Sequence, residues 1–168
     1  MLRRNPFTLI AIMAAFYAYY LTREVGRLIV VLALGLDVAP TIRYRVLVGF
    51  EVQSGVVEPT PTEMGLLILS GPGMALVAGY ALLAGLIGWG NRIHSRLRLM
   101  LGLMCYLTLV LDPIYYAVIP LFRLGGEPET VQYLLPISRL PIVAIAMGLL
   151  IFNIYIIQNK LIPLIRGE

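Results

Sequence analysis

Residues 6–36 read PFTLIAIMAAFYAYYLTREVGRLIVVLALGL, a long apolar run that is interrupted by the charged pentad REVGR at positions 23–27. The pentad holds three charged side chains, and the apolar runs on either side of it hold none. A charged side chain at membrane depth costs about 2.5–3.5 kcal/mol on insertion scales. A chain that places several charges inside such a segment must therefore pair them with one another or with other polar groups.

The composition is that of an integral membrane protein. Of the 168 residues, 60% are hydrophobic and 13% are charged, and the mean hydropathy is +0.88, which is far more apolar than an average soluble domain. The net charge of +4 comes without a long block of lysine or arginine, so it does not indicate nucleic-acid binding. We therefore expect a single all-α membrane domain over residues 1–168, without a nucleic-acid partner.

Apolar segments long enough to cross a bilayer as helices cover about residues 6–36, 64–89, 97–122 and 140–157. The tail that follows the last of them resembles an interfacial segment. Residues 41–58 alternate apolar and polar side chains and contain turn residues, a pattern typical of a β-hairpin or small sheet. The sequence thus predicts about four transmembrane helices, with a small β element between the first and the second.

The distribution of lysine and arginine predicts the orientation of the chain. With four spans both termini share one side of the membrane, and the positively charged side faces the cytoplasm. We therefore expect both termini in the cytoplasm and the chain integral to the plasma membrane. We also expect Arg92, Arg96 and Arg98 to face anionic lipid headgroups. The seven lysine and arginine residues on this side, against four on the other, are Arg3, Arg4, Arg92, Arg96, Arg98, Lys160 and Arg166.

Small residues recur on one side of the second segment. Gly71, Ala75 and Gly79 are spaced four residues apart, and Gly73 lies beside them. Residues at this spacing share a helix face, so another helix can approach closely there. We therefore expect this small-residue strip to be a helix-packing surface.

Proline interrupts two of the predicted helices. Pro72 lies within the second segment and Pro113 within the third, and each should kink its helix or end it. Asp112, next to Pro113, would then serve as a cap at the break. Residues 125–128 read GGEP, which is typical of a turn.

The spacing within the pentad predicts an ion-pair cluster. On a helix Arg23 and Arg27 share a face, and Glu24 lies three residues before Arg27, close enough to pair with it. Arg23 would then pair with Asp112 or with a partner subunit. Two alternatives remain open from the residues alone: the arginines bind a lipid headgroup or a substrate, or Glu24 and Asp112 form a proton or ion path.

Around the pentad, over roughly residues 10–125, the chain resembles the site-2 protease family of intramembrane zinc metalloproteases. That family carries HExGH near the end of its first core helix, and REVGR keeps the glutamate and the glycine. A small β element, a Gly-Pro helix start and a Leu-Asp-Gly motif follow in the family. Residues 41–58, Gly71-Pro72 and Leu111-Asp112 are the corresponding features here.

The resemblance implies a protease-like fold that has lost its metal site. Arg23 and Arg27 stand where the family has two histidine ligands, but a guanidinium stays protonated and has no lone pair to donate to zinc. Glu24 stands at the position of the general base, and Asp112 at that of the third ligand, with proline after it instead of glycine. The resemblance therefore implies a chain with no catalytic residues, no metal and no cofactor.

Together these features predict a non-catalytic accessory or scaffold subunit of a larger membrane complex, whose partners are other membrane protein subunits and lipids. Two other functions stay open. One is an active intramembrane protease with a non-standard site. The other is a small oligomeric channel or transporter that uses Glu24 and Asp112.

Overall fold

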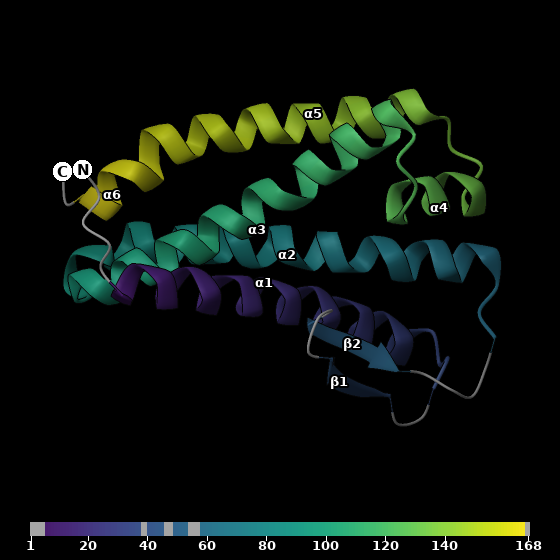
Figure 1. Ribbon diagram of the computed structural model, residues 1–168, viewed down its shortest axis with the longest axis horizontal. Coiled ribbons are helices and arrows are strands. Elements are labelled where there is room, and N and C mark those ends of the chain that lie inside the picture. Colours follow the sequence, from purple (N-terminus) through teal and green to yellow (C-terminus); the bar gives the residue numbers. More distant parts are fainter. Residues whose placement is uncertain (1–5, 38–39, 46–48, 54–57, 167–168) are drawn as a thin grey trace.

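A computed structural model describes residues 6–37, 40–45, 49–53 and 58–166. Figure 1 shows an elongated bundle of long helices, with a small strand pair beside α1 and a short helix, α4, near the start of α5. The elements in chain order are α1 (Pro6–Ala33), β1 (Thr41–Arg45), β2 (Gly49–Gln53), α2 (Pro61–Trp89), η1 (Gly90–Arg92), α3 (Ser95–Phe122), α4 (Glu127–Leu134), α5 (Arg139–Ile156), η2 (Ile157–Leu161) and α6 (Ile162–Arg166).

Three helical stretches of the described chain are long and apolar enough to cross a membrane: Pro61–Trp89, Ser95–Phe122 and Arg139–Arg166. The chain is therefore a mostly helical membrane protein, as its composition predicts. The predicted fourth span, α1, is not among these stretches, because α1 carries the charged pentad and several tyrosines. The count of four spans thus remains a prediction.

The first helix runs without a break through the charged pentad and past Gly26. At Gly26 the helix α1 lies very close to α2, because a Cβ atom added there would come to 2.5 Å from both the Met74 Cβ and the Ser70 carbonyl oxygen. Only a glycine allows the two backbones to approach so closely. A packing role for Gly26 was not predicted, because the small residues predicted to pack lie on the second segment alone.

The third helix continues through Pro113 and Pro120, so Pro113 does not end it and Asp112 does not cap a helix end; a kink at Pro113 stays a prediction. Pro113 has no N–H and so leaves the carbonyl of Leu109, one turn earlier, without its helical donor. The side-chain amide of Asn153, on α5, donates to that carbonyl at 2.6 Å and accepts a hydrogen bond from the Tyr80 hydroxyl on α2. Asn153 is completely buried. A buried amide thus joins three helices at the point where proline disturbs one of them.

The last helix extends further than predicted, because α5, the π-helical turn η2 and α6 form one continuous stretch from Arg139 to Arg166. The tail therefore continues the last helix, and its place at the membrane interface stays a prediction. Leu161 is 1% exposed and belongs to the hydrophobic core at this end. That core contains Leu83, Leu86, Cys105, Leu109, Val110, Ile157 and Leu161. The start of α1 and α6 lie at the same end of the bundle (Figure 1).

The β element lies where the sequence predicts it. The two strands pair antiparallel, with Ile42 opposite Val52, and β2 is the strand that lies along α1. The predicted residues 46–48 and 54–57 fall outside the described residues. The predicted turn at residues 125–128 lies at the same end of the molecule. It covers only Gly125 and Gly126, because α4 begins at Glu127. The short helix α4 was not predicted.

Candidate functional site

The charged pentad lies in the second half of α1, where β2, α3 and α4 surround it. Because the helix is regular here, Arg23 and Arg27 lie on one face and Glu24 lies beside Arg27. Glu24 is 3% exposed, and the arginine side chains are 11% and 21% exposed. We call Arg23, Glu24, Arg27, Asp112 and Glu127 the charged cluster.

Both arginines bind carboxylates from other parts of the chain. Arg27 forms an ion pair with Glu24 on its own helix and a second one with Glu127 on α4. Arg23 binds the other oxygen of Glu127, and its Nε lies 3.5 Å from Asp112 Oδ1 on α3. The predicted pairs, Glu24 with Arg27 and Arg23 with Asp112, are therefore both present. A single carboxylate, Glu127, bridges the two arginines.

The second oxygen of Glu24 binds the backbone of the strand pair. It accepts a hydrogen bond of 2.9 Å from the Val52 N–H on β2. Because β2 is an edge strand, its outward N–H groups need acceptors, and an unsatisfied one is costly near lipid. Glu24 thus attaches the β element to α1 while it neutralises Arg27.

Glu127 is the member of the cluster that the sequence did not indicate. It is the first residue of α4, directly after Gly126, which adopts φ +89. A Cβ atom at Gly126 would come within 2.5 Å of the Tyr115 hydroxyl, so glycine is needed in this turn for space as well as for backbone conformation. A Gly-Gly pair followed by an acidic residue and Pro128 is also a signature of a helix start, which could have placed this carboxylate.

The cluster holds more carboxyl groups than guanidinium groups. Among the described residues, two guanidinium groups face three carboxyl groups. Asp112 is the least satisfied of the three: it is 2% exposed, and neither of its oxygens accepts a well-formed hydrogen bond from the described residues. The Tyr19 hydroxyl lies near this carboxylate, and the Tyr19 ring packs 5.9 Å from the Arg23 guanidinium.

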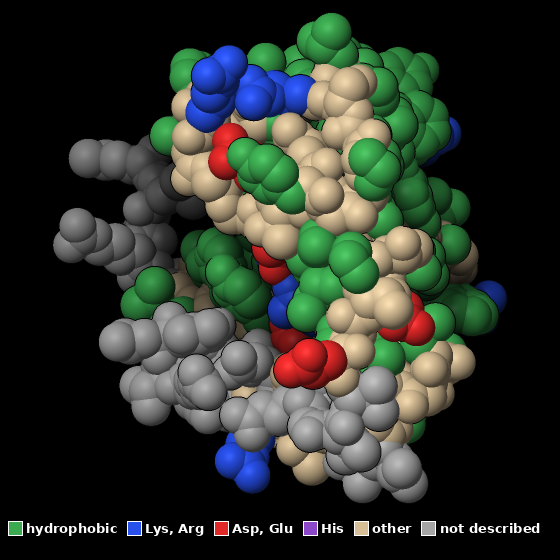
Figure 2. Space-filling model, turned by 90° about the vertical axis from the view of Figure 1, so that its right-hand side faces the viewer, with side chains coloured by type: hydrophobic (Ala, Val, Ile, Leu, Met, Phe, Trp, Pro, Cys, Tyr) green, Lys and Arg blue, Asp and Glu red, His purple; other side chains and the backbone are tan. Residues whose placement is uncertain are grey.

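The cluster lies beside the second half of α1, in the half of the bundle that also holds the strand pair and α4 (Figure 1). Figure 2 views the molecule from that side and shows acidic and basic side chains together in a recess between hydrophobic ones. The Glu127 side chain is 27% exposed, which makes it the most accessible member of the cluster. The charged groups that lie deeper, Glu24 and Asp112, are almost completely covered.

The small-residue strip lies inside the bundle. Ala75 is fully buried; a Cβ at Gly71 would contact Arg23 and Arg27, and one at Gly79 would lie 2.6 Å from Thr108. These residues therefore let α1 and α3 approach α2. Gly73 is placed differently, since a Cβ there would meet nothing within 4 Å.

The three arginines predicted to face lipid headgroups lie at the opposite end of the bundle from the charged cluster. Arg92 and Arg96 are exposed, and Arg96 lies 5.7 Å from the ring of Phe7 at the start of α1. Arg98 is only half-exposed, and its Nε is buried without a hydrogen-bond partner among the described residues. Contact of these arginines with lipid stays a prediction.

Chemically, the charged cluster can hold α1, α3, α4 and the strand pair together. Within the described ranges, no group of three or more His, Cys, Asp or Glu side chains has the arrangement of a metal site. Comparison with known protein families, curated proteins and solved structures finds no match for this chain.

Proposed function

We propose that this chain is a non-catalytic accessory or scaffold subunit of a larger membrane complex. In this proposal it has a site-2-protease-like fold, and an ion-pair cluster occupies the positions of the lost zinc ligands. Its partners are other membrane protein subunits and lipids. The proposal places the chain in the plasma membrane with both termini in the cytoplasm, which agrees with α1 starting and α6 ending at one end of the bundle.

The observation that carries the proposal is that both pentad arginines are held by carboxylates from other elements. Arg23 binds Asp112 and Glu127, and Arg27 binds Glu24 and Glu127. A guanidinium held in this way is a fixed positive charge, which repels a metal cation and accepts no proton. The arginine positions are therefore suited to structure and unsuited to zinc-dependent hydrolysis.

The surroundings of Glu24 support the same reading. In a protease of this kind the corresponding glutamate must take a proton from a water molecule. Here one oxygen of Glu24 binds the Arg27 guanidinium, and the other accepts the Val52 N–H. Both oxygens are thus engaged by donors from within the chain, so Glu24 is a structural anchor in this proposal.

The outer faces of α1 and α5 support contact with other membrane helices. Large apolar side chains are exposed along both helices, among them Leu9 and Ile10 on α1 and Ile145 and Ile151 on α5, each at least 63% exposed. Such faces suit either lipid tails or helices of a partner subunit. A chain with little mass outside its helical bundle offers mainly these faces for assembly.

The experiment that tests the proposal is gentle isolation. The full-length tagged chain would be purified from its own cells in a mild detergent, and native mass spectrometry would record both protein partners and metal ions. We expect stoichiometric partner chains and no zinc. An unrelated small membrane protein with the same tag controls for non-specific carry-over.

Two results would contradict the subunit proposal. The first is an isolated chain without partners that retains bound zinc, which would revive an enzyme with a non-standard site. The second is cleavage of a membrane substrate that Glu24→Gln abolishes while the variant still folds and assembles. Ion flux through proteoliposomes of the isolated chain that Glu24→Gln and Asp112→Asn both stop would favour the transporter alternative instead.

A further inference from the structure

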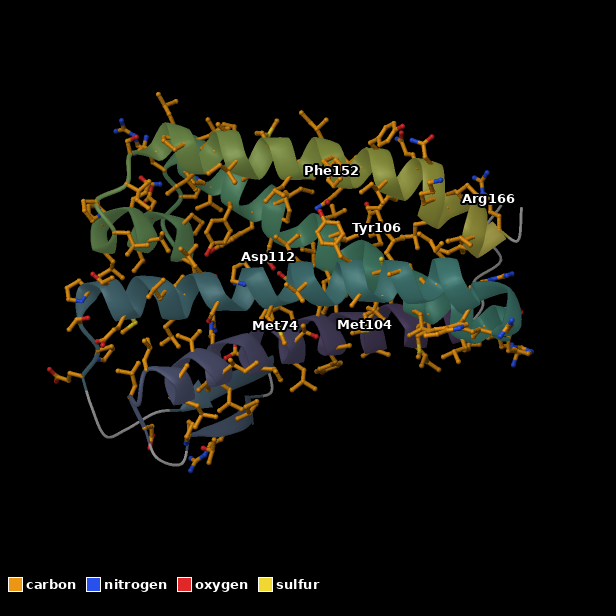
Figure 3. The ribbon with its side chains drawn as sticks, turned by 180° about the vertical axis from the view of Figure 1, so that it is seen from behind. Met74, Met104, Tyr106, Asp112, Phe152 and Arg166 are labelled. Carbon is orange, nitrogen blue, oxygen red and sulfur yellow. The ribbon has the colours of Figure 1, made fainter. Side chains whose placement is uncertain are left out.

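An open recess of about 590 Å³ lies at the end of the bundle where α3 ends, α4 runs and α5 begins. The side chains around it come from these three elements and include Arg123, Tyr133, Ser138, Arg139 and Leu140. In Figure 3 α4 and the start of α5 lie at one end of the bundle, Arg166 lies at the other, and Asp112 lies between them. Among the described residues that line the recess there is no member of the charged cluster.

The two arginines of the recess have no partner of opposite charge in the described part of the chain. No carboxylate lines the recess, and neither Arg123 nor Arg139 forms an ion pair or a side-chain hydrogen bond there. Arg123 is exposed; the Nε atom of Arg139 is covered, but its terminal nitrogens are not. Figure 2 faces this end and shows basic side-chain atoms gathered along its upper edge. Two guanidinium groups with open donors thus border one space, and such groups suit the oxygens of a phosphate.

Both arginines occupy positions that favour a different residue. Arg123 adopts a φ of +53, a left-handed conformation that usually falls to glycine, and the same turn uses Gly125 and Gly126 at its next two positive-φ positions. Arg139 is the first residue of α5, where the helix dipole favours negative charge, and the side chain of Ser138 before it forms no capping hydrogen bond. Neither guanidinium group therefore serves the local fold, and an anion between them would offset the unfavourable charge at the start of α5.

The recess lies where a membrane surface is expected. It connects the end of α3 to the start of α5, and both helices belong to stretches that are long and apolar enough to cross a membrane. Large side chains around it are exposed: Phe122 by 69%, Leu140 by 77% and Tyr133 by 85%. Arginine beside exposed aromatic and aliphatic side chains is typical of the boundary between the acyl chains and the headgroups of a bilayer. Phospholipids carry their phosphate groups at this boundary.

We propose that the recess binds a phosphate group, that of an anionic phospholipid, between the terminal nitrogens of Arg123 and Arg139. The acyl chains then lie along the exposed apolar side chains of α3 and α5. Charge complementarity selects an anionic lipid, because the described lining of the recess holds two positive charges and no carboxylate. The site rests on the part of the proposed function that makes lipids partners of the chain, and it does not require a partner subunit.

The test uses two lipid probes with the same acyl chains and a photoreactive diazirine close to the headgroup. One probe is a phosphatidylglycerol, and the other is a diacylglycerol, which lacks the phosphate. The full-length protein in phosphatidylcholine nanodiscs would receive a small share of either probe, and mass spectrometry would identify the crosslinked residues. We expect phosphatidylglycerol to label residues 123–140 about tenfold or more strongly than diacylglycerol, because only the phosphate accepts charge-assisted hydrogen bonds from the arginines. A parallel sample with excess inorganic phosphate separates a lipid headgroup from a free anion.

Variants of the two arginines separate binding from folding. Arg123→Gly removes the guanidinium and places glycine where the backbone is left-handed, so the Tm should stay the same or rise. The same variant should weaken phosphatidylglycerol labelling of residues 123–140 about tenfold, and Arg139→Gln should weaken it similarly. The matched control is Arg92→Gln, because Arg92 is an exposed arginine at the opposite end of the bundle. This control should leave the labelling of residues 123–140 unchanged.

The outcomes are distinguishable. Selective labelling that both variants weaken and that inorganic phosphate does not displace identifies a lipid headgroup. Selective labelling that inorganic phosphate displaces identifies a phosphate site that a soluble anion also fills, and either result supports the site. Equal labelling of residues 123–140 by the two probes, or labelling that is unchanged in folded Arg123→Gly and Arg139→Gln proteins, would overturn the proposal. Because the labelling is measured on the single chain, its failure is separate from a failure to find partner subunits.

Discussion

Pro113 would leave the Leu109 carbonyl without a hydrogen-bond donor at membrane depth, and the side-chain amide of Asn153 on another helix supplies that donor. Asn153 donates to the Leu109 carbonyl at 2.6 Å and accepts from Tyr80, and its side chain is fully buried. An interhelical hydrogen bond of this kind is worth about 0.6 kcal/mol on average in membrane proteins, and up to about 1.7 kcal/mol. Asn153 makes two of them, so it should matter to the stability of α3 and α5 together.

We predict that Asn153→Leu lowers the free energy of unfolding by about 1–3 kcal/mol, because it leaves the Leu109 carbonyl and the Tyr80 hydroxyl buried without partners. The measurement is reversible unfolding in mixed detergent micelles, followed by circular dichroism. The matched control is Asn159→Leu, because Asn159 is exposed and donates to the Tyr155 carbonyl one turn earlier on its own helix. Equal losses in the two variants would show that the buried amide has no special role.

For single residues, the sequence predicts the contacts that follow from the spacing of residues along a helix. Helical spacing alone predicts that Glu24 pairs with Arg27, and the need to neutralise Arg23 predicts Asp112. Glu127 could not be predicted in the same way, because it lies 104 residues from Arg23 in sequence and reaches it only through the turn after α3. The contact of Asn153 could have been predicted, because Pro113 leaves the Leu109 carbonyl in need of a donor and Asn153 is an amide in the last apolar segment.

Among the elements, glycines set how closely the helices approach. A Cβ on Gly79 would lie 2.6 Å from the Thr108 hydroxyl oxygen and 2.8 Å from a Leu109 methyl carbon, whereas one on Gly85 of the same helix would meet nothing within 4 Å. Helix propensity favours alanine over glycine by about 1 kcal/mol in a helix interior. The two positions on α2 should therefore respond to the same substitution in opposite directions.

We predict that Gly79→Ala destabilises the protein by about 1–3 kcal/mol, the usual effect of overpacking, and that Gly85→Ala leaves it unchanged or stabilises it by up to about 1 kcal/mol. Thermal unfolding of both variants in the same detergent measures the difference. If Gly79→Ala is as well tolerated as Gly85→Ala, α2 and α3 do not approach as closely as described.

The elements differ in how far the sequence could define them. Long apolar runs predicted α2, α3 and α5 well, because length and hydropathy decide a membrane helix. The helix α4 is only eight residues long and has a low share of apolar side chains, so no periodicity could reveal it. The small residues predicted a packing surface but not its partner, which is α1 at Gly71 and α3 at Gly79.

Across the whole molecule, the charged cluster connects parts of the chain that apolar packing alone would not place uniquely. It links α1 to β2 through Glu24, to α3 through Asp112 and to α4 through Glu127. Buried ion pairs add little net stability, but removing one partner is costly because the other charge stays buried and unpaired. The cluster therefore determines how α1, the strand pair, α3 and α4 pack against one another.

The most direct test of this structural role is a double-mutant cycle between Arg27 and Glu127, measured as free energies of unfolding. We predict that Arg27→Leu and Glu127→Leu are each destabilising. The double variant should lose less than the sum of the two by about 1–3 kcal/mol, because it leaves neither Arg27 nor Glu127 buried without the other. The control cycle pairs Arg92→Leu with Glu58→Leu, two exposed positions separated by the length of α2, which should be additive within about 0.5 kcal/mol. Additive losses for Arg27 and Glu127 would contradict the account, since the pentad arginines would then be free to serve a ligand or a substrate.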